Sequence, residues 1–163
     1  MEMGKLKTSL DTAVLENLII GRVYPHIYAF STNTVPKYWK VGDTVRPVEV
    51  RLSEWRKYYQ DLTQEYSRAA KVGDKFFRDY AIHGYLEREL GKERLQREDM
   101  PVGLYYSNEF FKDVNVENLE DAFRHIEEDV KQGGGIYQLY NEQHLPEILH
   151  YERDTEPYKL RPN

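Results

Sequence analysis

The sequence predicts an α+β fold in which a small central sheet, antiparallel or mixed and of about three strands, is flanked by helices. Residues 27–31 and 38–41 alternate as two short strands around the turn-forming residues 33–36, so they are expected to form a β-hairpin. Residues 65–72 supply a third strand. Apolar residues recur at helical spacing after the hairpin and after the third strand, which places helices beside the sheet.

Three helices follow from the apolar spacing in this part of the chain. The first opens at Pro47, a residue suited to a first turn, and Arg51 and Arg56 lie off its apolar stripe. The second is expected from about residue 76 to 90, and the third, with an acidic outer face, from 116 to 130. The stripe of the first helix consists of Val48, Leu52, Trp55 and Tyr59.

Composition indicates a globular protein with one main core. The chain has 163 residues, 31% of them charged, and no apolar run near the roughly 18 residues that suggest a membrane span. Cysteine is absent and the N-terminus lacks a secretory pattern, so a cytoplasmic location without membrane contact is expected. Net charge is −5, but residues 1–94 carry 16 Lys and Arg against 13 Asp and Glu. Phosphate binding depends on local charge, so the acidic remainder does not exclude a DNA partner.

The hairpin and the helix after it, residues 26–55, carry the most informative motif. Ile27 and Tyr28 on the first arm, and Lys40-Val41-Gly42 on the second, resemble the paired motifs of the GIY-YIG nuclease superfamily. His26 stands where that family has glycine, and Lys40 resembles the phage and restriction-associated "KIG" subfamily. The turn is short, so Tyr28 and Lys40 are expected on the same face of the sheet, with Arg51 reaching it.

The resemblance implies hydrolysis of a DNA phosphodiester by water, with Mg²⁺ or Mn²⁺ stabilising the leaving oxygen. Tyr28 would be the base, and Lys40 the cation that lowers its pKa. Arg51 would be the catalytic arginine, with Arg46 as the competing choice. On the residues alone, a strand tyrosine is usually a packing residue, and an arginine on a helix usually faces solvent. The expected substrate-binding residues are Arg46, Gly42 and Arg56.

The same resemblance assigns the metal to Asp79, where an aspartate replaces the family's glutamate and shortens the arm by one methylene. His83, expected among the catalytic residues, lies four residues later on the same helical face, and Glu87 is an alternative ligand. An Asp and His at this spacing also form ordinary helix-surface hydrogen bonds. Farther along, Asn108 is expected to be the catalytic polar residue and Glu109 the second choice, although Asn108 is equally suited to cap a turn.

Three segments describe the domain organisation. Residues 1–22 are expected to form an N-terminal helix, 23–132 a domain resembling GIY-YIG nucleases, and 133–163 a C-terminal extension or linker. The final residues 158–163 resemble the segment before a superfamily 2 helicase motor, which would make the chain the N-terminal module of a nuclease-helicase. An ordinary polar terminus is the other interpretation.

Function is therefore predicted as a divalent-metal-dependent DNA endonuclease in restriction or phage defence. The alternative is a nucleic-acid-binding or scaffold module that also resembles GIY-YIG nucleases but has lost its catalytic site. A third class, a protein-interaction domain, would use the acidic face of residues 117–129. Cleavage of plasmid DNA, compared with a Tyr28→Phe variant, separates the first class from the others.

Overall fold

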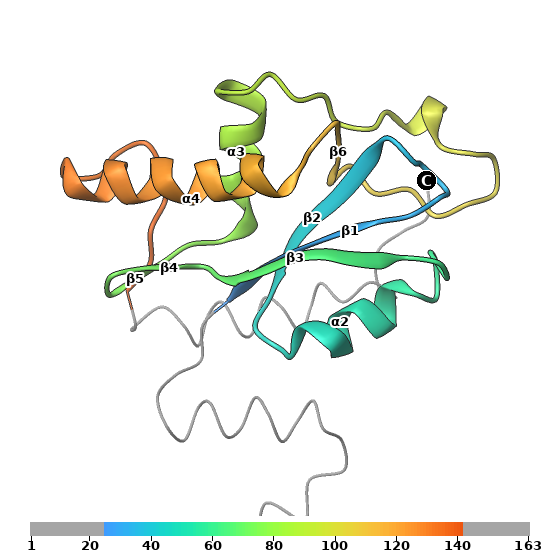
Figure 1. Cartoon of the computed structure of the whole chain (residues 1–163), viewed down its shortest axis with the longest axis horizontal. Helices are drawn as coiled ribbons and strands as arrows, with labels where there is room; N and C mark the ends of the chain where they lie inside the picture. The colour runs from blue at the N-terminus through green and yellow to red at the C-terminus, as the bar shows by residue number, and fades with distance from the viewer. Residues whose placement is uncertain (1–24, 142–163) are drawn as a thin grey trace, which may run out of the picture.

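An α+β fold is confirmed by the structure, a computed structural model that describes residues 25–141. Four antiparallel strands form the main sheet in the order β3-β1-β2-β6, and a second sheet contains two short strands (Figure 1). The strands are β1 (His26–Ser31), β2 (Tyr38–Thr44), β3 (Thr63–Ala69), β4 (Lys71–Val72), β5 (Lys75–Phe76) and β6 (Phe110–Lys112). The helices are α2 (Val48–Trp55), α3 (Asp79–Arg88) and α4 (Val116–Lys131), with a 3-10 turn η2 (Arg97–Asp99).

The predicted hairpin is formed by β1 and β2. Tyr28 lies opposite Gly42, and Phe30 lies opposite Lys40. Side chains alternate between the two faces of a strand. Tyr28 and Phe30 therefore point into one core, and Ile27 and Ala29 point into the other.

The sheet has one strand more than the sequence indicated. β3 pairs with β1 and starts two residues before the predicted third strand, and Ala70 separates it from β4. The fourth strand, β6, is only three residues long and lies inside an aromatic segment. It pairs with the start of β2, from Tyr38 to Lys40. Such a short strand has no alternation long enough to be recognised from sequence.

Two of the predicted helices are shorter than expected. α2 ends at Trp55, although Tyr59 still packs in the core as predicted. α3 begins at Asp79 rather than at residue 76, because Lys75–Phe76 pairs as strand β5. α4 agrees with its expected bounds and is capped by a reciprocal pair of hydrogen bonds between Asn115 and Asn118.

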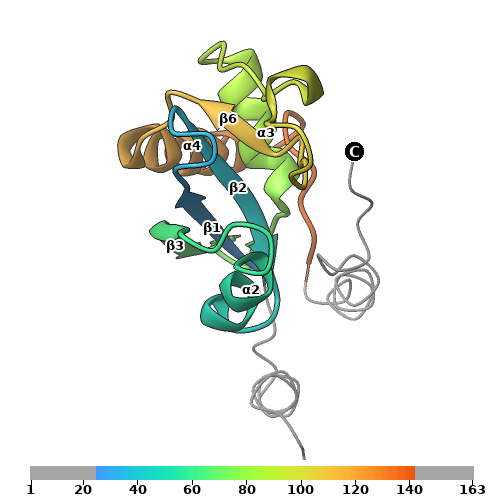
Figure 2. The same cartoon turned by 90° about the vertical axis from the view of Figure 1, so that its right-hand side faces the viewer.

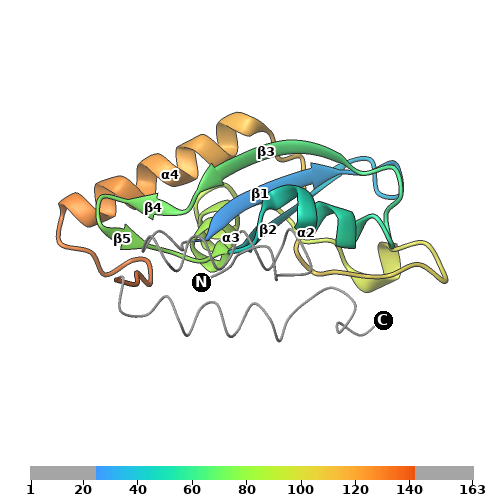
Figure 3. The ribbon, with the colours of Figure 1, turned by 90° about the horizontal axis from the view of Figure 1, so that it is seen from below.

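The sheet separates two hydrophobic cores. α2 covers one face, and α3 with α4 covers the other, as Figures 1 and 3 show. The α2-face core is a cluster rich in aromatic rings: Tyr28, Phe30, Trp55, Tyr59, Tyr105 and Phe110, together with aliphatic residues. The opposite core contains Ile27, Ala29, Val41, Ile82, Leu86, Phe111, Leu119, Phe123 and Ile126, among others. Protein cores are closely packed, so burying a charged side chain in them costs free energy unless another group compensates the charge.

The folded unit extends past residue 132. Tyr137 is buried, and the backbone of Tyr140 exchanges two hydrogen bonds with Phe76. The start of the expected C-terminal extension is therefore part of this domain. The predicted N-terminal helix and the helicase-like segment 158–163 lie outside the described residues. Among the described helices, none has the length and apolar character needed to cross a bilayer.

Candidate functional site

The candidate site lies at the edge of β2, next to the first residue of β6. β6 pairs with β2 only as far as Lys40, so the backbone of Val41 bonds elsewhere. Its amide donates to the carbonyl of Glu109 at 3.0 Å, and its carbonyl accepts a hydrogen bond from Nε2 of His83 at 2.7 Å. Figure 2 shows β6 beside β2 with α3 next to them. The end of a short strand and one helix therefore bring Glu109 and His83 together.

Gly42 leaves room for two predicted catalytic side chains. A Cβ atom at position 42 would lie 2.7 Å from Oη of Tyr28 and 2.9 Å from Nζ of Lys40. Both side chains thus end over Gly42, and each residue is only 1% exposed. The prediction that Tyr28 and Lys40 share a face of the sheet is confirmed. Gly42, expected to contact substrate, has a structural role here, because any larger residue would displace its two neighbours.

Helix α2 holds the Tyr28 phenol from the other side. Nε1 of Trp55 donates a hydrogen bond to Oη of Tyr28 at 2.7 Å. The Lys40 ammonium lies 4.4 Å from the centre of a Trp55 ring, and the Arg51 guanidinium 5.9 Å. These distances are typical of cation–π contacts. Trp55 therefore contacts Tyr28, Lys40 and Arg51. Arg51 lies on the expected face of the sheet.

The cations act on Tyr28 in the predicted direction, but burial outweighs them. Burial raises the pKa of the Tyr28 phenol above its ordinary value, while Lys40 and Arg51 oppose that shift. Burial also lowers the pKa of Lys40, yet the Glu109 carboxylate reverses this effect and the net shift is upward. Nζ of Lys40 donates to Oε1 of Glu109 at 2.7 Å. Lys40 is therefore charged, and Tyr28 is a neutral phenol at neutral pH.

The two candidate arginines share one carboxylate on α2. Glu54 accepts two hydrogen bonds from the Arg46 guanidinium, one of them at 2.9 Å, and one from Nη1 of Arg51 at 3.4 Å. Arg46 is 4% exposed and Arg51 is 5% exposed. Although Arg51 lies off the apolar stripe, it does not face solvent as arginines on helices usually do, because its side chain is buried and contacts Trp55.

Asp79 is fixed at the first position of α3. Its backbone amide donates to Oδ2 of Asp43 at 2.8 Å, and the same carboxylate is held by Nε and Nη2 of Arg78 at 2.6 and 3.0 Å. Asp43, from β2, thus caps α3 in place of a local side chain. Burial, followed by the negative charges of Asp43 and Glu109, raises the pKa of the Asp79 carboxyl well above its ordinary value.

Three potential metal ligands meet beside the catalytic candidates. One ligand atom each from Asp79, His83 and Glu109 lies within 4.8 Å of the others. Two carboxylates and an imidazole are suitable donors for a divalent cation. Because Lys40 contacts Glu109, this group adjoins the pair of Tyr28 and Lys40 above Gly42.

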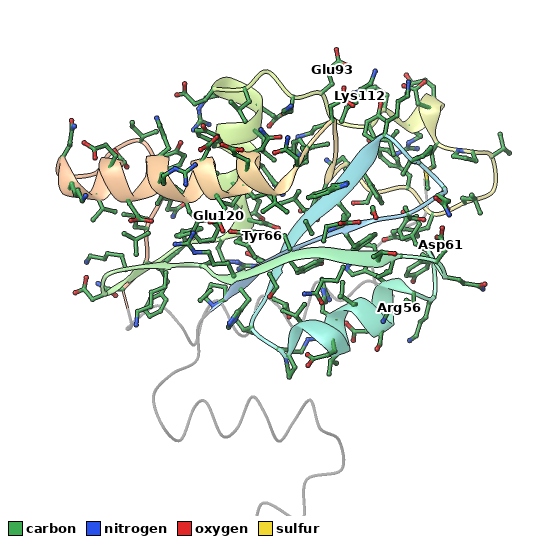
Figure 4. All side chains as sticks on the ribbon, viewed as in Figure 1. Arg56, Asp61, Tyr66, Glu93, Lys112 and Glu120 are labelled. Atoms are coloured by element: carbon green, nitrogen blue, oxygen red, sulfur yellow. The ribbon has the colours of Figure 1, made fainter. Side chains whose placement is uncertain are left out.

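Three predicted or alternative residues are not part of this group. Asn108 is exposed, and its backbone carbonyl accepts a hydrogen bond from Arg94. Glu87 forms a two-pronged pair with the same Arg94, at 2.9 and 3.0 Å. Arg56 is exposed at the end of α2, where Figure 4 labels it. The structure thus favours Glu109, the second choice, over Asn108.

Sequence reasoning missed three residues that shape the site. Trp55 was interpreted only as part of the apolar stripe, Glu54 was not considered, and Asp43 was passed over beside Gly42. Trp55 and Glu54 each carried a signal: helical spacing of three and four residues places both on the same side of α2 as Arg51. Asp43 carried none, because its partners are 35 and 36 residues away.

A comparison with known families decides what kind of domain this is. The model of the T5orf172 domain matches residues 25–127, which include every described residue of the site. The chain belongs to the T5orf172 domain family. No curated protein and no solved structure matches it.

Membership of the T5orf172 family corrects the resemblance drawn from residues 26–55. The assignment to the GIY-YIG superfamily is wrong, because the matched family is a different one. The quoted motif is short, and packing alone explains two of its residues. Tyr28 fills a core, and Gly42 leaves room for the Tyr28 side chain. Residues 25–127 are therefore described as a T5orf172 domain.

Proposed function

We propose that this T5orf172 domain is an endonuclease that hydrolyses DNA phosphodiester bonds with the help of a divalent metal ion. The observation that carries the proposal is the convergence over Gly42 of Tyr28 and Lys40, next to a three-residue ligand group. Phosphodiester hydrolysis needs a base for the water, cations for the phosphate and carboxylates for the metal. All three kinds of group are present here.

Tyr28 is the proposed base, acting as its phenolate. Trp55 donates a hydrogen bond to the phenol oxygen, and hydrogen bonds to a charged form stabilise it. Lys40 and Arg51 favour the same form electrostatically. The phenolate would take the proton of a water molecule placed beside the phosphate. Trp55 acts through Tyr28 and is a positioning residue.

Arg51 is proposed to bind a non-bridging oxygen of the phosphate. Its planar guanidinium offers parallel N–H donors to such an oxygen, and it lies on the same face of the sheet as the base. Glu54 accepts from it at 3.4 Å, a long hydrogen bond that a phosphate oxygen would readily replace. Arg46, which binds Glu54 with two hydrogen bonds, keeps that carboxylate in position.

A divalent cation fits the ligand group formed by Asp79, His83 and Glu109. The Asp79 carboxylate is buried and makes no hydrogen bond or ion pair with another residue of the part that the structure describes. Such a group is costly unless a cation or proton compensates it. When bound, the metal supplies a positive charge for the leaving oxygen. The setting expected from sequence, restriction or phage defence, stays a prediction.

Plasmid cleavage tests this function. The full chain, incubated with supercoiled DNA and Mg²⁺ or Mn²⁺, is expected to convert it to nicked and linear forms. Tyr28→Phe removes only the phenol oxygen and is expected to be inactive. Tyr66→Phe makes the same change on the opposite face, where Figure 4 labels Tyr66, and is expected to retain activity.

Two results would contradict the proposal. Cleavage that persists in excess EDTA would exclude a metal-dependent reaction, and equal activity of Tyr28→Phe would exclude Tyr28 as the base. DNA binding without cleavage by the wild-type chain would instead support the alternative of a nucleic-acid-binding module.

A further inference from the structure

A hollow between α3 and the segment that follows α4 plays no part in the proposed reaction. Figure 2 shows that segment running beside α3. The volume of the hollow is about 80 Å³, well below the roughly 300–1,000 Å³ of pockets that enclose drug-sized ligands. It therefore fits a small chemical group rather than a whole nucleotide. The polar side chains that line it are those of Arg78, Tyr80, Arg88, Tyr137, Gln138 and Tyr140.

The lining of this hollow is rich in hydrogen-bond donors and positively charged. Guanidinium, phenol and amide groups all donate hydrogen bonds, and none of the described residues that line the hollow carries a carboxylate. Two hydrogen bonds to Asp43 balance the charge of Arg78, so the net positive charge comes from Arg88. Glu89, the next residue on α3, lies 3.9 Å from His125 and is not part of the lining. Such a lining suits an anion.

The Arg88 side chain lies back along α3 toward the hollow. A Cβ atom on Gly84 would lie 2.5 Å from Nη1 of Arg88, so the guanidinium passes directly over that glycine. Long side chains on helices commonly point toward the N-terminus of the helix, and Ala81, about one turn earlier, also lines the hollow. The guanidinium carbon is 5.7 Å from the centre of the Tyr137 ring on the opposite wall. Two small residues thus give Arg88 room to reach this wall.

The hollow adjoins the candidate site along α3. Tyr80 directly follows Asp79, and its ring centre is 6.4 Å from that of His83. Each strand of DNA carries a phosphate every 3.4 Å along the helix axis, so a strand bound at the candidate site has further phosphates beside α3. The wall formed by residues 136–140 lies after the range 25–127 that the family model matches. The hollow is therefore a feature of this chain beyond the matched family range.

We propose that this hollow binds a phosphate group through the Arg88 guanidinium, with the Gln138 amide and the Tyr140 hydroxyl as further donors. The planar N–H groups of arginine match the spacing of phosphate oxygens. The phosphate is either a backbone group of DNA or the free ion, and the position beside the candidate site favours DNA. Only this DNA source rests on the proposed function, because phosphate binding itself requires neither metal nor cleavage.

NMR of the ¹⁵N-labelled full chain with inorganic phosphate tests the hollow itself. The Nε–H signal of Arg88 should shift and saturate, while that of the exposed Arg124 on α4 should not move at matched ionic strength. Gln138→Glu adds a carboxylate to the lining and should weaken phosphate binding by about tenfold. Gln64→Glu makes the same change at an exposed position of β3 and should bind like the wild type.

Binding of a labelled DNA duplex in EDTA identifies the source of the phosphate. Arg88→Gln should weaken binding by about tenfold and reduce the slope of log K against log salt by about one, because one phosphate contact is lost. Arg124→Gln removes the same charge away from the hollow and should leave affinity and slope unchanged. A purely structural role of Arg88 would lower the fraction of active protein without changing the slope.

The outcomes of the two measurements separate the inference from the proposed function. A saturable phosphate shift with unchanged DNA affinity in Arg88→Gln would assign the hollow to free phosphate. No shift, together with unchanged DNA binding, would overturn the inference. Gln138→Glu covers the case in which Arg88→Gln does not fold. DNA binding through Arg88 without cleavage would reject the proposed function alone, and cleavage by a chain whose hollow binds no phosphate would reject only this inference.

Discussion

The two faces of the central sheet are packed in different ways. The core under α3 and α4 is mostly apolar. Its buried charged residues are gathered at the start of α3, where Arg78 pairs with Asp43, and Arg68 pairs with Glu120 and Glu127 at the rim. Under α2, by contrast, the charges of Lys40 and Arg51 are buried among aromatic rings. Burying a charge costs several kcal/mol unless it is compensated. Here, ion pairs and ring faces provide the compensation.

The two faces differ in where charge is buried. The α3 and α4 face supplies stability, while the α2 face accepts buried cations that a purely structural core would exclude. The acidic side of α4 is also partly used within the domain, because Arg68 on β3 neutralises two of its glutamates (Figure 4 labels Glu120). The predictions below compare the residues buried under α2 with residues elsewhere in the domain.

The largest effect is expected from Arg51→Lys, with Arg68→Lys as its counterpart on the other face. Both changes keep the positive charge and remove the planar fork. Loss of one preorganised donor to a reacting phosphate typically costs about 10²–10³ in rate. Arg51→Lys should lower the DNA cleavage rate by that factor, while Arg68→Lys should stay within about twofold. Similar losses in both variants would remove the distinction between the faces.

The pH dependence of cleavage should report the buried phenol. Because the folded-state pKa of Tyr28 lies above its ordinary value, its phenolate is scarce at neutral pH and becomes more abundant as pH rises. The rate at saturating metal should therefore increase about tenfold per pH unit between roughly pH 6.5 and 8.5. Tyr66, on the opposite face, has a pKa raised to about 12 by burial, and Tyr66→Phe should leave the profile unchanged. A flat profile would exclude phenolate catalysis.

Two glycines compare the faces by the same substitution. In Gly42→Ala, the new methyl group would push against the Tyr28 ring and the Lys40 ammonium, so we expect a loss of about 1–3 kcal/mol in unfolding free energy and much weaker cleavage. In Gly84→Ala, the methyl group meets only the exposed Arg88 guanidinium, which can swing away. Alanine is favoured in helices, so stability should be unchanged or rise by up to about 1 kcal/mol. Chemical denaturation measures both values. A Gly42→Ala variant with wild-type stability and activity would show that position 42 has room for a methyl group beside Tyr28 and Lys40.

The smallest effect concerns a carboxylate at the far end of the hairpin. Asp61 accepts hydrogen bonds from Oγ1 of Thr32 at 2.6 Å and from the amide of Asn33 at 2.8 Å, and these bonds lower its pKa. A folded-state pKa below the unfolded value adds stability above that unfolded value, and this stability is lost as pH falls through the folded pKa. Asp61→Asn should lower the melting temperature by less than about 2 °C at pH 7 and by nothing in acid. DNA cleavage should not change, because the hydrogen bonds of Asp61 (labelled in Figure 4) go to the hairpin turn at Thr32 and Asn33 and not to the site.

The sequence by itself determined the hairpin, the helices and several members of the site. Alternation and turn residues predicted β1 and β2, and the strand period of two then placed Tyr28, Lys40 and Gly42 on one face. Helical periodicity predicted α2, α3 and α4, and the spacing of four residues placed Asp79 and His83 on one side of α3. These features depend on local patterns of a few residues, which a sequence displays directly.

Only the tertiary structure decided which distant groups meet. β6 is too short to be recognised from sequence, yet its end places Glu109 rather than Asn108 beside His83 and Lys40. The capping of α3 by Asp43 likewise joins residues that are far apart in the chain. The short hairpin motif also suggested the wrong family, because the chain belongs to the T5orf172 domain family. Contacts between distant segments depend on how strands and helices pack, and local periodicity carries no information about that packing.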